Sequence, residues 1–302
     1  MVKKIFSIVN SIVKNLFTQD KESILVRWYD MQNTIPNNSI VEIPKIIWIY
    51  WDSDKIPEIV KICIDSVEKH CTNYKINILT LSTLDNYIKL PHISSDVEPA
   101  NIADLIRLML LEEYGGIWMD ASIFLTENLD WIVDRMEKQD AFLFYSDECT
   151  VDAKHPISEN WLIVAPKKSL FIKDWLEEYK KCILSSNPKG YYSSLKNNKE
   201  VLQNLNNPEY LLCYISAIIT LQKGKYNILY ASSGTTGHYY NYKYLWNAYA
   251  ISTLLLLRDR NSIAVPKLVK ITGSVRPAIS RFIKYKFYSK KSLLGNYLIN
   301  SK

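Results

Sequence analysis

The stretch Tyr114-Gly-Gly-Ile-Trp-Met-Asp-Ala-Ser122 joins a helical pattern to a short apolar segment that ends in a carboxylate. Before it, apolar side chains recur at helical spacing over residues 99–114, which predicts a helix. The two glycines then permit a sharp turn and a close approach of the backbone. Residues 117–119 follow as a predicted strand, and Asp120 stands at its carboxyl end. Because ligands of open α/β sheets bind beyond the carboxyl ends of the strands, we expect a ligand at Asp120.

Strands and helices are predicted to alternate along the rest of the chain. Short apolar runs rich in β-branched and aromatic residues predict strands, and apolar residues at helical spacing predict helices. The predicted strands are residues 43–51, 75–79, 141–145, 161–165, 227–230 and 268–271, and the predicted helices are residues 59–70, 84–89, 170–184 and 210–222. This alternation indicates an α/β fold with an open, mostly parallel sheet flanked by helices.

Both ends of the chain are expected to extend this sheet domain. Residues 1–40 are an expected helical N-terminal extension, because apolar side chains over residues 3–17 follow an amphipathic helical pattern. That helix either lies in a membrane interface or packs against the body of the protein. Residues 41–275 are the expected sheet domain, and residues 276–302 are a basic C-terminal tail with a helical extension.

The C-terminal segment carries the positive charge of the chain. Nine Lys and Arg and no Asp or Glu lie within residues 267–302, whereas the whole chain has 37 basic and 31 acidic residues. Basic tails contact nucleic acids or anionic membranes, and the alternative is a solvated helix surface. We expect no nucleic-acid binding, because the chain has no recognisable groove-reading or stacking motif.

The cysteines and the apolar runs indicate a cellular compartment. Five cysteines are widely spaced and form no C-x-x-C pair, which argues against a disulfide framework or a zinc knuckle. No apolar run approaches the ~20 residues that a membrane-spanning helix needs. Charged residues, Lys14 among them, interrupt the apolar start of the chain, unlike a signal peptide. We therefore expect a cytoplasmic protein, either free or peripheral on the inner face of the membrane.

Asp104, Arg107 and Asp120 form a candidate site. Asp104 and Arg107 lie three residues apart on one helix face, where two such residues alone are commonly an ordinary surface ion pair. Together with Asp120 they suggest that the chain binds a nucleoside diphosphate, a leaving group with two adjacent negative phosphates. A Mg²⁺ or Mn²⁺ ion bridging both phosphates stabilises such a leaving group. These ions prefer oxygen ligands, typically carboxylates and water.

This arrangement resembles the D-x-D signature of GT-A glycosyltransferases. It is most similar to capsular polysaccharide synthesis proteins with a D-x-D sugar-binding region, which are related to glycosyltransferase family 32. Similar segments elsewhere in the chain are Ile43-Pro-Lys-Ile-Ile-Trp48, Asn101-Ile-Ala-Asp-Leu-Ile-Arg107, Glu159-Asn-Trp-Leu-Ile-Val-Ala165 and Tyr210-Leu-Leu-Cys-Tyr214. The resemblance covers residues 41–275 and implies a GT-A-like fold.

The resemblance implies a metal-dependent hexosyltransferase. It would transfer a sugar from a nucleotide-sugar, a UDP-sugar, to a growing capsular or cell-envelope polysaccharide, with retention of anomeric configuration. The acceptor glycan would be free or linked to a lipid carrier at the inner membrane face. Asp104 and Arg107 would hold the donor, and Asp120 would ligate Mn²⁺ or Mg²⁺ or a water bound to it. The residues implied near the uracil are Trp48, Tyr50 and Trp51.

The sequence departs from a strict D-x-D, because Ser122 stands where a second Asp is required. A hydroxyl can ligate the metal or its water but adds no charge, so a further ligand is expected later in the chain. His238, which ends the hydroxyl-rich segment 232–238, is either that ligand or a loop histidine without a chemical role. Lys270 is similar to a basic position late in the family and is expected to neutralise phosphate. The departure also allows an alternative function, a nucleotide-sugar-binding protein that has lost catalysis.

Overall fold

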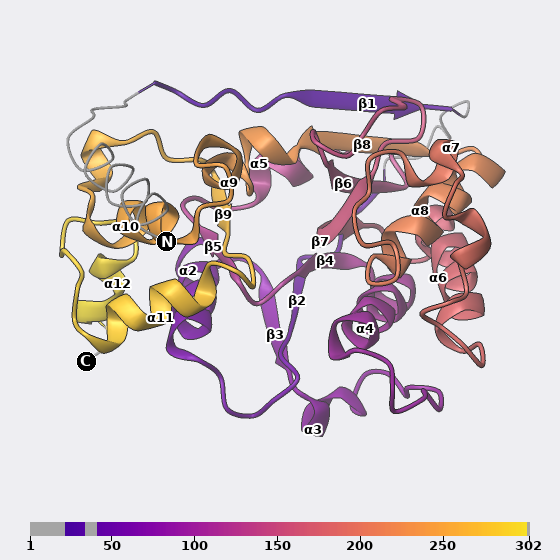
Figure 1. The fold of residues 1–302 in the computed structure, drawn as a ribbon, viewed down its shortest axis with the longest axis horizontal. Helices are drawn as coiled ribbons and strands as arrows, with labels where there is room; N and C mark the ends of the chain where they lie inside the picture. Colours follow the sequence, from indigo (N-terminus) through magenta and orange to yellow (C-terminus); the bar gives the residue numbers. More distant parts are fainter. Residues whose placement is uncertain (1–21, 34–40, 301–302) are drawn as a thin grey trace.

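The computed structural model describes residues 22–33 and 41–300 (Figure 1). The predicted helix over residues 3–17 lies outside these residues. Seven strands form the central sheet, in the order β1-β8-β6-β7-β4-β2-β3. The strands are β1 (Trp28–Gln32), β2 (Ile46–Tyr50), β3 (Lys75–Leu79), β4 (Gly116–Met119), β6 (Ala141–Tyr145), β7 (Ser158–Ala165) and β8 (Asn227–Ser232).

Most strands of this sheet run in one direction. Strand β2 pairs in parallel with both β3 and β4, and β6 pairs in parallel with β8. Strand β7 is antiparallel to its neighbours β4 and β6, and the edge strand β1 is antiparallel to β8. Five of the seven strands therefore share a direction, while β1 and β7 oppose it. This arrangement confirms the predicted open, mostly parallel sheet.

Helices cover both faces of the sheet (Figure 1). Successive strand residues point to opposite faces, so Ile47 and Ile49 join one hydrophobic core while Trp48 and Tyr50 join the other. The core with the two isoleucines is closed by α2 (Glu58–His70), α10 (Ala248–Leu257), α11 (Arg276–Lys284) and α12 (Gly295–Asn300). The core with Trp48 is closed by α4 (Pro99–Tyr114), α6 (Leu170–Ile183), α7 (Lys199–Leu202) and α8 (Leu212–Lys223).

A second, two-stranded sheet brings the late part of the chain to the end of β4. Strand β5 (Ile123–Leu125) pairs antiparallel with β9 (Leu268–Lys270), and its register sets Ile123 opposite Lys270. The backbone N–H of Ile271 also donates to the carbonyl of Ser122 at 2.9 Å. This pairing holds Lys270 beside the segment that follows Asp120.

The Gly-Gly turn between α4 and β4 requires glycine at both positions. Gly115 has φ 65° and Gly116 has φ 93°, a region that L side chains rarely adopt. A Cβ atom on Gly115 would lie 2.4 Å from the backbone nitrogen of Lys167, and one on Gly116 would lie 2.6 Å from the carbonyl oxygen of Ile46. The predicted sharp turn with close backbone approach is confirmed.

The structure differs locally from the predicted elements. Strand β1 lies within the expected N-terminal extension and was not predicted; it forms because five residues pair with β8 across the chain. The helix predicted over residues 84–89 is instead α3 (Leu81–Leu84). A capping box begins it at Thr80, whose backbone N–H donates to Thr83 Oγ1 at 2.9 Å. Further short helices are α5 (Asp130–Val133) and α9 (Tyr239–Lys243).

The C-terminal helices pack on the body of the protein. Ile279 and Ile283 of α11, with Leu294 and Leu298 beyond it, are buried in the same core as α2. Residues 276–300 therefore form part of the packed structure in addition to carrying positive charge. Within the described ranges, no helix is long and apolar enough to cross a membrane.

Candidate active site

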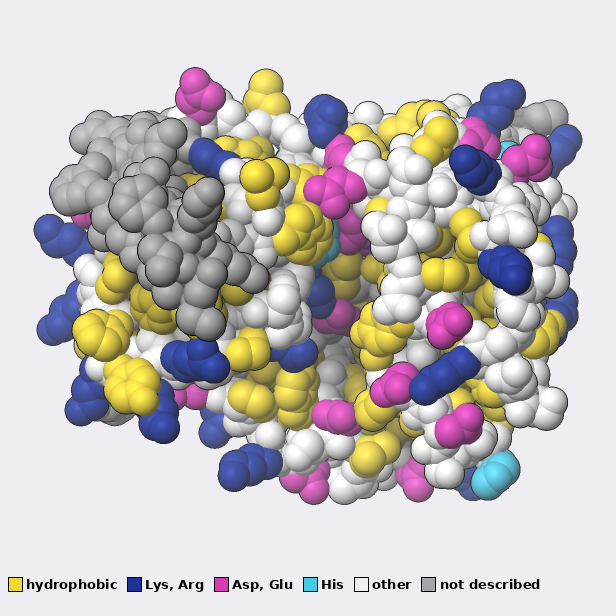
Figure 2. Space-filling view, viewed as in Figure 1, with side chains coloured by type: hydrophobic (Ala, Val, Ile, Leu, Met, Phe, Trp, Pro, Cys, Tyr) yellow, Lys and Arg dark blue, Asp and Glu magenta, His cyan; other side chains and the backbone are white. Residues whose placement is uncertain are grey.

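A pocket of about 580 Å³ opens at the carboxyl ends of β2 and β4. Figure 2 shows this face of the molecule hollowed near its middle, with basic and acidic side chains in the depression. Residues from eight separate stretches of the chain line it: Tyr50, Trp51, Asp52, Pro99, Ala100, Ala103, Asp104, Arg107, Trp118, Asp120, Ala121, Ser122, Asn160, Trp161, Tyr210, Leu211, Tyr214, His238, Trp246, Lys270, Thr272, Gly273 and Arg276. Eight of the nine residues predicted for the site are among them.

Arg107 is the centre of a buried polar network in this pocket. Its Nη2 atom lies 3.0 Å from Asp104 Oδ1 and 3.3 Å from Asp120 Oδ1. Its Nη1 atom donates to the carbonyl oxygen of Asn160 at 2.7 Å. The guanidinium also lies over the ring of Trp118, 5.1 Å from the centroid. Because Arg107 is only 4% exposed, it is a fixed structural charge and the solvated surface pair is excluded.

Asp104 is buried beside this arginine. Asn160 Nδ2 donates to Asp104 Oδ1 at 3.0 Å, so the same oxygen accepts from two side chains. Burial raises the pKa of Asp104 to about 6, although Arg107 opposes the shift. Its charge is therefore sensitive to pH just below neutrality.

Asp120 lies between two cations. Lys270 Nζ donates to Oδ2 at 2.5 Å, while Arg107 and the indole N–H of Trp118, which donates at 3.1 Å, face Oδ1. Lys270 Nζ also donates to Ser122 Oγ at 3.2 Å. Burial alone raises the pKa of Asp120, but Lys270 and Arg107 outweigh it and hold the pKa below its ordinary value. Asp120 is thus ionised, and both of its oxygens already have partners.

His238 is paired with a buried carboxylate. Its Nε2 atom lies 3.0 Å from Glu159 Oε2, which also accepts from the indole N–H of Trp161. Burial alone raises the pKa of Glu159, but His238 and the hydrogen bonds to this carboxylate outweigh it and lower the pKa. The ring of Trp246 lies 5.2 Å from the ring of His238, centroid to centroid. His238 therefore lines the pocket with its ring hydrogen-bonded to Glu159 and packed against aromatic side chains.

The predicted metal ligands have other partners in this structure. Asp120 faces Lys270, Ser122 Oγ accepts from the same lysine, and His238 faces Glu159. In the part of the chain that is described, no three His, Cys, Asp or Glu side chains gather as a metal site. A divalent cation is bound mainly by carboxylate oxygens, and this set offers one carboxylate that two cations already neutralise. The residues present do not fit a protein-held Mn²⁺ or Mg²⁺.

Trp48 does not line the pocket, unlike Tyr50 and Trp51. Trp48 is only 1% exposed, and its indole N–H donates to the carbonyl of Gly115 at 3.0 Å. It shares a sheet face with Tyr50 but lies two residues before the end of β2, beneath the pocket floor. Its ring packs on Tyr87, with centroids 5.1 Å apart. Trp48 is a core residue that supports the Gly-Gly turn.

Several lining residues were not predicted. Four of them lie in segments that carry the family resemblance, which is the signal that points to Asn160, Trp161, Tyr210 and Tyr214. No sequence pattern points to Trp246 as a pocket residue. Arg276 belongs to the basic C-terminal segment, and its guanidinium lies 5.4 Å from the ring centroid of Trp51, over the end of β2.

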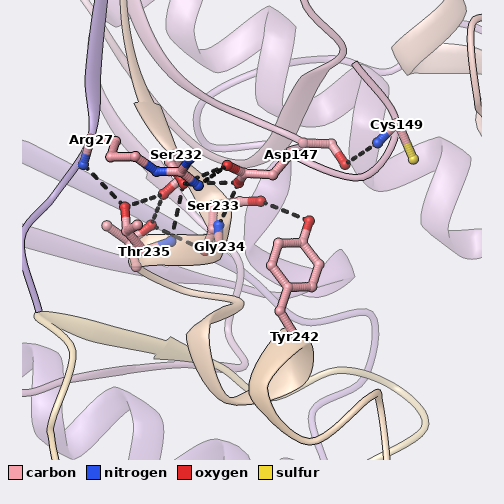
Figure 3. Close-up of polar contacts among 10 residues, drawn as sticks. Arg27, Asp147, Cys149, Ser232, Ser233, Gly234, Thr235 and Tyr242 are labelled. Carbon is pink, nitrogen blue, oxygen red and sulfur yellow. Dashed lines mark hydrogen bonds and ion pairs between the residues drawn. The ribbon is translucent and has the colours of Figure 1, made fainter. Parts of the chain in front are cut away.

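A group of hydrogen bonds centred on Asp147 holds the loop that leads to His238 (Figure 3). Asp147, after β6, accepts from Arg27 Nη2 at 2.5 Å, from Ser232 Oγ at 2.8 Å and from the backbone N–H of Gly234 at 2.7 Å. Ser233 Oγ lies 3.2 Å from the hydroxyl of Tyr242. The loop over residues 232–238 is therefore held by side chains from three other segments, and its position is well defined.

The seven-stranded sheet with flanking helices and a pocket at the strand ends is consistent with a GT-A-like glycosyltransferase fold. A family model described as "Capsular polysaccharide synthesis protein" matches residues 2–208. The chain therefore belongs to the capsular polysaccharide synthesis protein family. No curated protein matches the chain significantly.

Solved structures of glycosyltransferases resemble the chain at low sequence identity. The PaToxG glycosyltransferase is 15% identical, over 92% of this chain and 91% of its own, with a TM-score of 0.35. GlyE of Streptococcus pneumoniae is 14% identical, over 86% of this chain and 64% of its own, with a TM-score of 0.41. The galactosyltransferase LgtC, solved with donor and acceptor sugar analogues, is 11% identical, over 74% of this chain and 86% of its own, with a TM-score of 0.36. At such identities and TM-scores, these structures do not identify the activity of this chain.

Proposed function

We propose that the chain is a hexosyltransferase that moves a sugar from a nucleotide-sugar, a UDP-sugar, to a growing capsular or cell-envelope polysaccharide. The main support is the buried set of Asp104, Arg107, Asp120 and Lys270 in a pocket at the carboxyl ends of parallel strands. Fixed charges of both signs in a concave site suit a ligand with an anionic diphosphate and a hydroxyl-rich sugar. Membership of the capsular polysaccharide synthesis family supports the same reaction.

The pocket offers a separate environment to each part of the donor. Tyr50 and Trp51 provide aromatic faces for the base at the end of β2. Lys270 and Arg276 provide positive charge for the diphosphate. The ionised carboxylate of Asp120, together with Asp104, can accept hydrogen bonds from sugar hydroxyls. The donor is thereby oriented with its anomeric carbon toward the open part of the pocket.

Retention of configuration is part of the proposal, and it removes the need for a general base. In a retaining transfer on one face of the sugar, the leaving diphosphate accepts the proton of the attacking hydroxyl. Glu159 is already bound by His238 and Trp161, so we assign it a positioning role for the pocket wall. The residues of this chain then bind the donor, orient it and stabilise the leaving group.

Two aromatic residues at the rim of the pocket suit the acceptor glycan. Tyr210 is 47% exposed and Trp246 is 40% exposed. Trp246 has φ 59° and follows Leu245 with φ 47°, a conformation that costs ~1–3 kcal/mol for each non-glycine residue. It is held by a hydrogen bond from its backbone N–H to the carbonyl of Asn241 at 2.7 Å and by packing on His238. A strained backbone that presents a large aromatic face supports a role in stacking on a sugar ring.

An exposed basic and aromatic surface after α11 supports contact with an anionic membrane. Tyr285 and Phe287 are 64% and 63% exposed. Figure 2 shows basic and hydrophobic side chains close together at this end of the molecule, on the left. The exposed basic residues around the two rings are Arg281, Lys284, Lys286, Lys290 and Lys291. Lysines near an anionic surface each contribute ~1 kcal/mol of attraction, and exposed aromatic rings enter the lipid interface.

Membrane contact is tested with substitutions, because truncation removes the buried α12. We expect the Gln variant of Lys284, Lys286, Lys290 and Lys291 to lose binding to vesicles that contain phosphatidylserine. The control exchanges four exposed lysines elsewhere, Lys61, Lys154, Lys196 and Lys199, and should bind like the unchanged protein. Equal binding of both variants would remove the support for this surface.

The transfer reaction is tested by a donor screen. UDP- and GDP-sugars are tested by thermal shift, and those that stabilise the protein are then assayed for release of the nucleoside diphosphate. A glycosyltransferase releases it with turnover. The alternative function, a nucleotide-sugar-binding protein without catalysis, is supported by the incomplete metal ligand set, and such a protein shows the thermal shift without release.

A further inference from the structure

We propose that the ammonium group of Lys270 takes the place of a protein-bound divalent cation in this pocket, so that transfer proceeds without Mn²⁺ or Mg²⁺. This inference rests on the proposed function, because it concerns how the charge of a departing nucleoside diphosphate is neutralised. It departs from the metal dependence that the family resemblance implies.

Lys270 contacts both polar side chains of the D-x-S segment. Its Nζ atom donates to Asp120 Oδ2 at 2.5 Å and to Ser122 Oγ at 3.2 Å. These are the two side chains of the D-x-S segment that a bound metal would use. The positive charge of the Lys270 ammonium therefore already lies between the oxygens that would otherwise hold a metal cation.

The lysine is held there by the fold. The β5–β9 pairing sets Lys270 opposite Ile123, and its backbone N–H donates to the carbonyl of Gly237 at 2.9 Å. Its side chain is 12% exposed, so the ammonium lies at the pocket wall with little freedom. A lysine in a mobile, exposed segment could move away from an incoming metal. The backbone around Lys270 cannot move in this way, because hydrogen bonds hold it on both sides.

The ammonium of Lys270 has one more hydrogen-bond donor than its two contacts in the pocket use. A lysine ammonium has three N–H groups and no acceptor. Two of them point to Asp120 and Ser122, which leaves one for an oxygen of the diphosphate. A compact charge with rotatable donors can bind phosphate as a point charge. The same group can therefore bind the carboxylate and the leaving group together.

The other charges near the pocket agree with this role. Arg107 is bound to Asp104 and Asp120 and balances their charge with Lys270. Arg276 adds a further positive charge, and within the described residues it forms no ion pair. Asp52 also lines the pocket but is exposed at its mouth. A diphosphate placed between Lys270 and Arg276 would therefore have a cationic side chain on each side, and Arg276 is the one whose charge no carboxylate of the network balances.

The reaction balances without a metal. The bond between the anomeric carbon and the diphosphate oxygen breaks, and its electron pair stays on that oxygen. The acceptor hydroxyl oxygen forms the new bond to the anomeric carbon, and its proton passes to the leaving diphosphate. Lys270 stays protonated throughout and donates more strongly as the negative charge develops.

The test measures donor cleavage and nucleotide binding in full-length protein treated with EDTA, against protein supplied with Mn²⁺ or Mg²⁺. We expect equal turnover and an equal Kd for the nucleoside diphosphate in all conditions. Lys270→Met should lower kcat about 100-fold. It should also weaken the binding of the nucleoside diphosphate more than that of the monophosphate, and added Mn²⁺ should restore neither kcat nor binding. Lys270→Arg, which keeps the charge, should retain part of both. Lys267→Met is the matched control, because Lys267 lies on the same segment but pairs with Glu127 outside the pocket.

The outcomes separate this inference from the proposed function. Turnover that disappears in EDTA and returns with Mn²⁺ overturns the inference and leaves the transferase intact. Binding of the diphosphate that is unchanged in a folded Lys270→Met variant also overturns it, and thermal unfolding shows whether that variant is folded. If no donor is cleaved with or without metal, the proposed function itself fails.

Discussion

Lys270 and Asp120 form an ion pair of 2.5 Å across 150 residues of sequence. The pair joins the end of a central strand to a late strand of a separate small sheet. Through Arg107 it continues to Asp104, so one connected network runs from α4 to β9. The floor of the pocket therefore depends on contacts that form only when the whole sheet domain is folded.

Replacing Arg107 by lysine should impair both stability and donor binding. A lysine cannot keep the three separate contacts to Asp104, Asp120 and Asn160, because it lacks the forked guanidinium. Breaking a buried charge network of this kind costs ~3 kcal/mol. We expect a lower unfolding midpoint in urea and a loss of donor-induced thermal shift. The control is Arg135→Lys, because the guanidinium of Arg135 lies over Trp28 away from the pocket, and it should show neither effect. A donor-induced thermal shift that persists in Arg107→Lys would contradict the assignment.

Activity should fall as the pH drops through about 6, the pKa of Asp104. Below that pH the carboxyl is protonated and no longer pairs with Arg107, so kcat/KM should decrease about tenfold per pH unit. The stability effect has the opposite sign. The folded state takes up this proton at a higher pH than the unfolded state, so Asp104 adds stability as the pH falls from about 6 to its ordinary 3.8.

The pH profile of Asp104→Asn checks this assignment. The variant should be less active than the unchanged protein at pH 8, and its profile should lack the acidic limb near pH 6. Circular dichroism at each pH reports whether the fold persists. An acidic limb that remains in the variant would assign it to another group.

Trp246→Ala should weaken binding of the acceptor and leave binding of the donor unchanged. The indole lines the rim of the pocket and packs on His238, away from the network around Arg107. We expect a rise of about two- to tenfold in the acceptor KM, taking the ~0.5–1.5 kcal/mol of a stacked aromatic contact as the guide for a sugar on the indole. Donor hydrolysis without acceptor should change little. Phe287→Ala removes an exposed ring far from the pocket and serves as the control; equal acceptor KM values in both variants would refute the stacking role.

Gly115→Ala should destabilise the protein strongly. Its backbone φ of 65° disfavours any side chain, and the new Cβ would lie 2.4 Å from the backbone nitrogen of Lys167. The combined strain should exceed ~2 kcal/mol in the free energy of unfolding, measured by urea titration. Gly273→Ala is the comparison, because its Cβ would meet only Arg276 Nη2 at an ordinary 3.5 Å. Similar stabilities for the two variants would mean that the turn tolerates side chains.

The local part of the fold could be predicted from the sequence. Helix α4 has the predicted bounds, as do β3 and β6, because each is a strongly patterned segment between clear boundaries. Asp120 lies at a pocket as expected, because the carboxyl ends of parallel strands form ligand sites. The two glycines have the positive φ values that their turn predicts.

The remaining features depend on contacts between distant segments. No local pattern shows that Lys270 reaches Asp120, because only the β5–β9 pairing sets that distance. The same holds for Trp246, which enters the pocket through two left-handed residues in a polar loop. The family resemblance implied that Trp48 lies near the base, but a matching segment does not tell how far each of its residues lies from the end of the strand. A motif likewise does not reveal which side chains contact Ser122 and His238, so their contacts with Lys270 and Glu159 could not be predicted.

The most direct test of the proposed function is the release of nucleoside diphosphate from a UDP-sugar by the purified full-length protein, compared with its Asp120→Asn variant. The variant keeps the shape of the side chain and removes the charge that Lys270 and Arg107 share. The proposed function predicts sustained turnover by the unchanged protein, and a variant that is folded and at least about 100-fold slower. Binding of the donor by the unchanged protein with no release of diphosphate, in the presence or absence of metal, would contradict it.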